Sequence, residues 1–352
     1  MGFDSIIGHE KQKSMLLSLL EKERLPHAFL FSGPEGIGKK KVVLEFAKHI
    51  LCDKGFACGV CRPCIKIDRG SHPDIFIIDK QYIERILQAQ RKKASSDNPD
   101  GEKEISSIGI DFIRGNIEKK IRGINQEVHE YPYEGQKRII IIDGADRMTV
   151  EATNALLKTL EEPPSFNIFF LITPSERDIP LTIRSRCMRL VFSPLHREQL
   201  KEYFESTLLV NNEKAELLSY ISHGSIGSGL FWTMEENFSL RRKIAELVLG
   251  KNKSFLRASV IAEKVAKNQR EMTMFLSFIL SLYRDVYCVR ECGDTAMIVN
   301  KDIRELLEWE KINLVRIKTS IQRIEHTINL LRYNVNKWLI FENLMLRLME
   351  SA

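Results

Sequence analysis

The sequence predicts an α/β domain built on a parallel sheet, followed by a region that is entirely helical. Two observations predict this division. In residues 1–194, short apolar runs alternate with segments of helical character, which is the pattern of buried parallel strands joined by helices. After Pro194 such runs cease, and apolar residues recur with the helical period while Gly and Pro become scarce. A chain of 352 residues is expected to form two or three domains.

Five runs are expected to form the strands of the sheet. They share a short length, apolar side chains on both faces and polar boundaries, and they span residues 27–32, 75–78, 138–143, 167–173 and 188–192. A helix is expected from Lys39 to Ile50, directly after a glycine-rich segment. The stretch 81–107, which is polar and rich in Ser, Asp and Lys, is expected to be a mobile surface insertion.

The helical half is expected to contain two domains. Helical periodicity begins at Leu195 and continues to Leu209, and it is strongest over residues 312–349. The simplest partition is an α/β domain over residues 1–194, a small helical domain over 195–245 and a larger helical domain over 246–352.

Composition places the chain among soluble globular proteins, since 43% of its residues are hydrophobic and 28% are charged. The net charge of +6 is mild and does not by itself indicate a nucleic-acid partner. The N-terminus lacks the apolar run of a secretory signal, and no segment is expected to span a bilayer. We therefore expect a cytoplasmic protein without a membrane partner.

A glycine-rich loop follows the first expected strand and precedes a helix, which is the context of a phosphate-binding P-loop. Gly33, Gly38 and Lys39 have the spacing G-x4-G-K, and Gly36 lies between them. The glycines free backbone N–H groups to surround phosphates, and the lysine contacts the terminal phosphates. ATP or ADP is therefore expected to fit this loop, against the alternative of an ordinary strand-to-helix turn.

Two parts that ATP hydrolysis requires are missing around this loop. The residue after Lys39 should be Ser or Thr, whose hydroxyl binds Mg²⁺, but here it is Lys40. Asp143 ends an apolar strand as a Walker B carboxylate does, but Gly144 follows it in place of the usual Glu. We expect no Mg²⁺ at this site and no ATPase activity from the chain itself.

Four of the seven cysteines lie close together, at Cys52, Cys58, Cys61 and Cys64. Disulfides are disfavoured in a reducing cytoplasm, so clustered thiols indicate a metal. Four cysteine sulfurs suit tetrahedral Zn²⁺ in a closed, structural site. The Cys-x2-Cys-x2-Cys part is also similar to an iron–sulfur ligand run, which remains the alternative. Residues 52–64 are therefore expected to form an inserted zinc module.

Several separated stretches resemble the bacterial clamp-loader subunits of the AAA+ ATPases, and among them the delta-prime family. These stretches span nearly the whole chain: FDSIIGHE (3–10), LPHAFLFSGPEGIGKK (25–40), the cysteine cluster, GSHPDI (70–75), NALLKTLEEPP (154–164), LITPSERDIPLTIRSRC (171–187) and NVNKWLIFENLMLRL (334–348). The resemblance implies an AAA+ domain with a parallel sheet, followed by two all-helical domains, a small lid and a C-terminal collar.

The resemblance also assigns roles to single residues. It implies that Arg186, in a Ser-Arg-Cys triplet, is an arginine finger that stabilises charge on the phosphoryl group in a neighbouring subunit's nucleotide site. Thr173 matches the position that the family names sensor 1. Active members carry an Arg where this chain has Gly227, so with Lys40 and Gly144 a third catalytic element is missing. This combination favours delta-prime over the gamma/tau ATPase.

The implied function is that of a non-catalytic subunit in the pentameric loader that places the sliding clamp on primed DNA. Its partners would be the gamma/tau and delta subunits, with the clamp and DNA reached through the complex. A ring-like collar would bury apolar residues of the last helix: Trp338, Leu339, Phe341, Leu344 and Leu348. Two alternatives stay open, an active gamma/tau-like ATPase and a zinc-dependent nucleic-acid-binding module on a vestigial ATPase fold.

Overall fold

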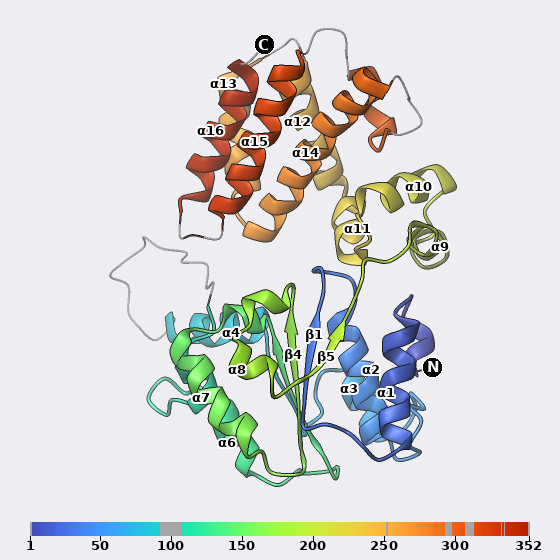
Figure 1. The fold of residues 1–352 in the computed structure, drawn as a ribbon, viewed down its shortest axis with the longest axis vertical. Helices are drawn as coiled ribbons and strands as arrows, with labels where there is room; N and C mark the ends of the chain where they lie inside the picture. Colours follow the sequence, from blue (N-terminus) through green and yellow to red (C-terminus); the bar gives the residue numbers. More distant parts are fainter. Residues whose placement is uncertain are drawn as a thin grey trace. The chain divides into compact units, whose positions relative to one another are not determined.

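The computed structural model describes residues 2–91, 107–250, 253–292, 298–306, 313–331, 333 and 335–350. The chain divides into two compact units, Met1–His196 and Arg197–Ala352, and each is described by itself. The first unit holds the sheet, and the second is built from helices (Figure 1). The finer division of the helical part near residue 245 stays a prediction.

The first unit contains a five-stranded parallel sheet in the order β2-β3-β4-β1-β5. Its strands are β1 (Ala28–Ser32), β2 (Ile75–Ile78), β3 (Arg138–Asp143), β4 (Asn167–Thr173) and β5 (Met188–Val191). All five predicted strands are confirmed to within one residue at each end. Their side chains are apolar on both faces because helices cover both faces of the sheet.

The helices of this unit divide between the two faces (Figure 1). One face packs against η1 (Gly2–Ser5), α1 (Glu10–Glu21), α2 (Lys39–Leu51) and α3 (Arg62–Asp68). The other face packs against α4 (Lys80–Arg91), α5 (Ile110–Arg114), α6 (Ile124–His129), α7 (Val150–Glu161) and α8 (Leu181–Arg184). Because the strands are parallel, their carboxyl ends lie at a single edge of the sheet.

The glycine-rich loop joins β1 to α2 at that edge. Gly33 has φ +147°, and a Cβ on it would lie 2.2 Å from the carbonyl oxygen of Phe192. Only glycine can therefore pass the chain so close to the end of β5. Gly36 and Gly38 also have positive φ, which lets the loop curve before the first turn of α2.

The predicted mobile insertion over residues 81–107 is wrong in its first part, because α4 occupies Lys80–Arg91. The helix begins after Asp79, whose carboxylate accepts a hydrogen bond from the backbone N–H of Tyr82 at 2.7 Å. Ile83 is buried, and Tyr82, Ile86 and Leu87 pack beside it on the core. Their i, i+3 and i+4 spacing forms one apolar face. The remainder of the predicted insertion, residues 92–106, lies outside the described residues.

The second unit is helical throughout the part of the chain that the structure describes, as predicted. Its elements are α9 (Arg197–Leu208), α10 (Asn212–Ile221), α11 (Ile226–Thr233), α12 (Glu235–Leu249), α13 (Phe255–Val265), α14 (Gln269–Cys292), η5 (Lys301–Leu306), α15 (Leu314–Leu330) and α16 (Lys337–Glu350). The strongly helical stretch 312–349 is divided between two helices. The second of them begins beside Asn336, whose side chain accepts from the N–H of Leu339.

Helix α14 departs from the expectation that no segment could cross a membrane. Over Gln269–Glu291 it is long and apolar enough to do so by length and composition. Of its apolar window, 56% is buried inside the unit, and Leu276, Leu282 and Tyr283 are fully buried. A core helix satisfies the same criterion, and the contacts of α14 with α12 and α15 give it that role.

A buried polar network holds the segment after α14 onto the helices of this unit. Arg241 of α12 is only 1% exposed, and it donates to Asn300 Oδ1 at 2.6 Å and to Asp302 Oδ1 at 3.0 Å. Its guanidinium carbon lies 4.7 Å from the ring centre of Phe278. Asp285 of α14 accepts from the backbone N–H of Asn300 at 2.9 Å, which closes the network.

Replacing Arg241 with Ala is expected to lower the free energy of unfolding by about 3 kcal/mol, because it leaves buried acceptors without their charged donor. Arg242→Ala is the matched control. Its neighbouring side chain is 54% exposed and pairs with Glu246 and Glu305 at the surface, so its loss should cost about 0–1 kcal/mol. Urea unfolding of the two variants, followed by circular dichroism, measures the difference. Equal losses in both would contradict the assignment.

Candidate nucleotide, metal and arginine sites

Lys39 of the glycine-rich loop is buried and is bonded to the loop itself. Its Nζ donates to the carbonyl oxygen of Gly33 and, at 2.7 Å, to that of Pro34. Burial lowers the pKa of Lys39 to about 8, although Glu35 and Asp143 act in the opposite direction. A bound phosphate would offer this ammonium a full negative charge in place of two carbonyl dipoles.

Lys40 bridges two carboxylates at the ends of neighbouring strands. Its Nζ lies 2.5 Å from Asp79 Oδ2 and 3.6 Å from Asp143 Oδ2. Asp79 directly follows β2, and Asp143 is the last residue of β3. The sequence analysis did not identify Asp79, but its position at the carboxyl end of a parallel strand could have indicated it.

The space beside Asp143 is filled by Arg147. Gly144 has φ +93°, and a Cβ on it would lie 2.2 Å from a guanidinium nitrogen of Arg147. The same guanidinium donates to the carbonyl oxygen of Asp143 at 3.0 Å. A side chain at position 144 would require this guanidinium to move aside, and the positive φ would strain any residue other than glycine there.

A second carboxylate that the sequence analysis did not identify lies in this region, on Asp146. Burial raises its pKa, while a backbone N–H and the charge of Arg147 act in the opposite direction. Its Oδ1 is buried without a hydrogen-bond partner among the described residues. Thr173 is itself fully buried at the end of β4, where its hydroxyl donates to the carbonyl oxygen of Ser175 at 2.9 Å. The predicted residues Lys39, Lys40, Asp143 and Thr173 thus share one edge of the sheet.

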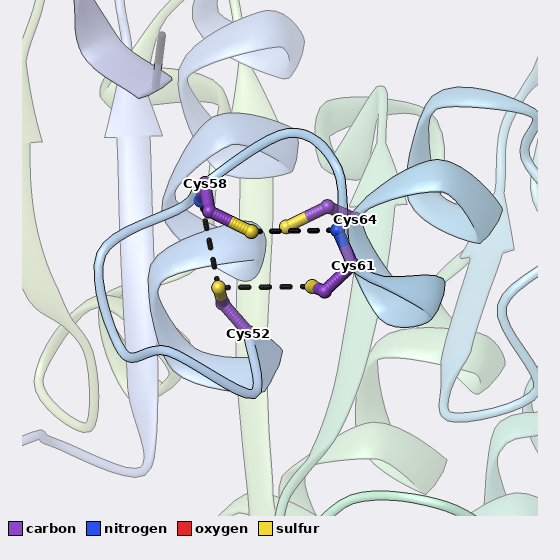
Figure 2. A group of neighbouring side chains, drawn as sticks. All are labelled: Cys52, Cys58, Cys61 and Cys64. Carbon is purple, nitrogen blue, oxygen red and sulfur yellow. Dashed lines mark hydrogen bonds between the residues drawn. The ribbon is translucent and has the colours of Figure 1, made fainter.

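The four clustered cysteines come together as the sequence predicts (Figure 2). All four sulfur atoms lie within 4.8 Å of one another, and those of Cys52 and Cys61 are 3.7 Å apart. Four thiolates about 2.3 Å from one tetrahedral ion would be about 3.8 Å apart. The cluster can therefore hold a single metal ion.

Backbone N–H groups support the cluster. Cys52 Sγ accepts from the N–H of Lys54 at 3.4 Å and of Cys58 at 3.5 Å, and Cys58 Sγ accepts from the N–H of Cys61 at 3.4 Å. Burial opposes ionisation of Cys52, but these donors outweigh it and lower the pKa of its thiol to about 6. A lowered pKa favours the thiolate, which is the form that binds metals.

An ion pair joins α2 and α3, the two helices on either side of the cysteine cluster. Lys48 of α2 lies 2.5 Å from Asp68 at the end of α3 and 2.9 Å from Glu45. Burial opposes the charge on Lys48, but its two carboxylate partners raise its pKa above the ordinary value. Cys52 follows the end of α2, and Cys61 precedes the start of α3, so the two helices fix the cluster from both sides.

Arg186 lies at the opposite edge of the sheet from the glycine-rich loop. It precedes β5, and the pairing of Phe29 with Met188 places it beside the amino end of β1. Its guanidinium donates to Glu161 Oε1 at 2.6 Å and to the carbonyl oxygen of Thr182 at 2.8 Å. The side chain of Arg186 is 34% exposed. Contact with Glu161, the last residue of α7, was not foreseen from the sequence.

Two other positions considered in the sequence are Cys187 and Gly227. Cys187 is buried beside Arg186, and burial raises the pKa of its thiol to about 12. This thiol is therefore a core side chain, as expected for the scattered cysteines. Gly227 lies in α11, in the second unit, so its distance from the glycine-rich loop is not part of the described geometry.

Comparison with known protein families shows which family this chain belongs to. Residues 8–196 match the family model described as "DNA polymerase III, delta subunit", and residues 237–350 match the model of the C-terminal part of that subunit. The chain belongs to the DNA polymerase III delta subunit family. The predicted fold class is confirmed in its architecture, a parallel-sheet domain followed by helices.

The individual relatives are of two kinds, delta' subunits and tau subunits of DNA polymerase III. The chain is 28% identical to the DNA polymerase III subunit delta' of Bacillus subtilis, over 96% of this chain and 95% of that protein. It is 25% identical to subunit delta' of Pseudomonas aeruginosa, over 76% of this chain and 73% of that protein. It is 35% identical to subunit tau of Bacillus subtilis, but over only 54% of this chain and 29% of that protein. The match to the Bacillus subtilis delta' protein thus covers nearly all of both chains, whereas the match to tau covers about half of this chain and less than a third of tau.

Proposed function

We propose that the chain is a delta-prime-type subunit of the DNA polymerase III clamp loader, which takes part in ATP-driven loading of the sliding clamp onto primed DNA. Its partners are gamma/tau and delta subunits, and it acts in the cytoplasm. One observation carries the proposal: the candidate nucleotide loop and Arg186 lie at opposite edges of one sheet. A strand of five residues spans about 16 Å, so Arg186 is too far from the chain's own loop to serve it.

Two features support a nucleotide site that does not hydrolyse ATP. Lys40 pairs with Asp79 and Asp143, the carboxylates that would otherwise be available to Mg²⁺. Gly144 stands where a catalytic glutamate would follow Asp143, and its backbone at φ +93° disfavours a side chain at that position. ATP or ADP could contact the glycine-rich loop and Lys39, but glycine stands where the residue that activates water is usually found.

We infer that the cysteine cluster holds structural Zn²⁺. Four thiolates close a tetrahedral shell and leave no position for substrate or water. The sulfur atoms are also close together, which suits one ion better than a cluster that must place several irons and sulfides between them. The ion would bind the loop after α2 to α3 and give this loop a fixed shape.

The proposal retains a small lid over residues 195–245 and a collar over 246–352. In the last helix, Phe341, Leu344 and Leu348 are buried inside the unit, so they are core residues. Trp338 and Leu339 are 41% and 55% exposed, and they remain available for a neighbouring subunit. Of the five predicted collar residues, these two are the candidates for an intersubunit contact.

Reconstitution tests the proposal. The chain is expected to co-elute with the gamma/tau and delta subunits of its own organism in size-exclusion chromatography, and its omission should abolish clamp loading on primed DNA. Alone, with Mg²⁺ and primed DNA, it should show no steady ATP turnover. Turnover that Lys39→Ala abolishes would establish the active-ATPase alternative instead. Tight DNA binding by the chain alone, with a steep salt dependence, would favour the nucleic-acid-binding alternative.

A further inference from the structure

Three charged side chains meet at the carboxyl edge of the sheet, beside the glycine-rich loop. The ammonium of Lys40 lies 2.5 Å from Asp79 and 3.6 Å from Asp143. The three come from different elements, since Asp79 follows β2, Asp143 ends β3 and Lys40 lies in the first turn of α2. The side chain of Asp79 is only 14% exposed, and those of Lys40 and Asp143 are about one third exposed.

In a hydrolytic P-loop protein, the place that the Lys40 ammonium takes here belongs to a Mg²⁺ ion. There the residue after the P-loop lysine supplies a hydroxyl to Mg²⁺, and the Walker B aspartate stands in the same coordination sphere. Here the residue at the first position is itself a cation, and it bonds the carboxylates directly. A divalent ion would have to displace the ammonium from Asp79 and would then be repelled by it.

We propose that the Lys40 ammonium is a built-in cation that replaces Mg²⁺, so that the site binds nucleoside phosphates as their metal-free anions. This inference rests on the proposed nucleotide site at the glycine-rich loop. The groups left for phosphate need no metal: Gly36 and Gly38, at positive φ, expose loop N–H groups, and Lys39 supplies a second ammonium. Lys40 supplies the charge that Mg²⁺ would otherwise contribute next to the terminal phosphate.

Asp79 determines where the Lys40 ammonium lies. A free lysine at the start of α2 would extend into solvent, because its four-carbon stem is flexible and its ammonium is strongly hydrated. The hydrogen bond to Asp79, which is fixed at the end of β2, holds the ammonium over the strand ends. The same carboxylate begins α4 through Tyr82, so its position depends on the fold and not on Lys40 alone.

Binding of ADP to the full chain, measured by isothermal titration calorimetry in EDTA and in Mg²⁺, tests the inference. The wild-type chain is expected to bind ADP more weakly in Mg²⁺ than in EDTA, because Mg²⁺ converts free ADP into a metal complex that the Lys40 ammonium repels. Lys40→Thr restores the hydroxyl and frees both carboxylates, so its affinity should be at least about tenfold higher in Mg²⁺ than in EDTA. Lys41→Thr is the matched control: Lys41 is exposed and bonded only to the carbonyl oxygen of Ser5 among the described contacts. It should behave as wild type.

Three results would overturn the inference. The first is wild-type binding that is as tight in Mg²⁺ as in EDTA, or tighter, and the second is no ADP binding by the wild-type chain in either condition. The third is a folded Lys40→Thr variant whose affinity is the same with and without Mg²⁺. The first two need no variant, so a failure of Lys40→Thr to fold leaves the inference testable. Because the isolated chain is used, each of these results is independent of whether the chain assembles with clamp-loader subunits.

Discussion

Replacing Arg186 with Ala is expected to lower ATP turnover about 1000-fold or more at the one neighbouring site that receives it, because an arginine finger stabilises charge that develops on the transferred phosphoryl group. Assembly should persist, since the Arg186 side chain is partly exposed and its ion pair with Glu161 lies at the surface. The measurement is single-turnover hydrolysis in a reconstituted complex in which only that neighbouring site retains its own P-loop lysine.

The contact with Glu161 leaves Arg186 able to act in this way. The two side chains are 34% and 50% exposed, and an ion pair of that exposure is worth about 0–1 kcal/mol. A triphosphate in a neighbour's site would therefore compete successfully for the guanidinium. Until then, Glu161 and the carbonyl oxygen of Thr182 hold it in a defined orientation.

Two variants serve as controls for the loss of Arg186. Arg189→Ala removes an exposed arginine three positions away, on β5, and should leave turnover at the wild-type level. Arg186→Lys keeps the charge but loses the planar fork, so it should restore only part of the activity. If Arg186→Ala leaves turnover unchanged, or if Arg189→Ala lowers it equally, the finger is not Arg186.

The sheet was predictable because buried parallel strands have a strong local signature. Ile139 to Ile142 are buried on both faces of the sheet, so this strand is a short continuous apolar run with polar residues at its ends. Helix α4 was missed for the opposite reason. Its charged and polar residues resemble those of the stretch that follows it, and its apolar stripe becomes decisive only when it packs against β2. Amphipathic spacing of Tyr82, Ile83, Ile86 and Leu87 was the available clue.

The sites were predictable where the residues are close in sequence. The glycine-rich loop and the cysteine cluster each lie within a few turns of chain, so their spacing alone identifies them. The partners of Lys40 and Arg186 were not predictable in this way. Asp79 lies beside Asp143 because β2 is next to β3, and Lys40 reaches both because α2 packs across that face of the sheet. Glu161 meets Arg186 because α7 and α8 pack together. The sequence shows that Lys40 replaces the Ser or Thr that would bind Mg²⁺. That Asp79 and Asp143 bind the Lys40 ammonium is seen only in the folded structure.

Removing the metal from the cysteine cluster is expected to have the second large effect. Cys61→Ser should lower zinc affinity more than about 100-fold and reduce the free energy of unfolding by about 3 kcal/mol or more, because binding energy at a structural site is folding energy. Cys61 lies at the start of α3 and contributes a sulfur near that of Cys52. Metal content per chain and thermal unfolding, with and without a chelator, measure both effects.

Cys288→Ser is the matched control, because Cys288 lies in α14, outside the cluster. It should retain one zinc ion per chain and an unchanged response to chelator. Acidification should release the metal from the wild-type chain, since protons compete with the ion for each thiolate. A brown protein with absorbance at about 400 nm would show an iron–sulfur cluster in place of zinc. If Cys61→Ser has the metal content and unfolding temperature of Cys288→Ser, the cluster does not hold the metal, and another contact must fix the loop between α2 and α3.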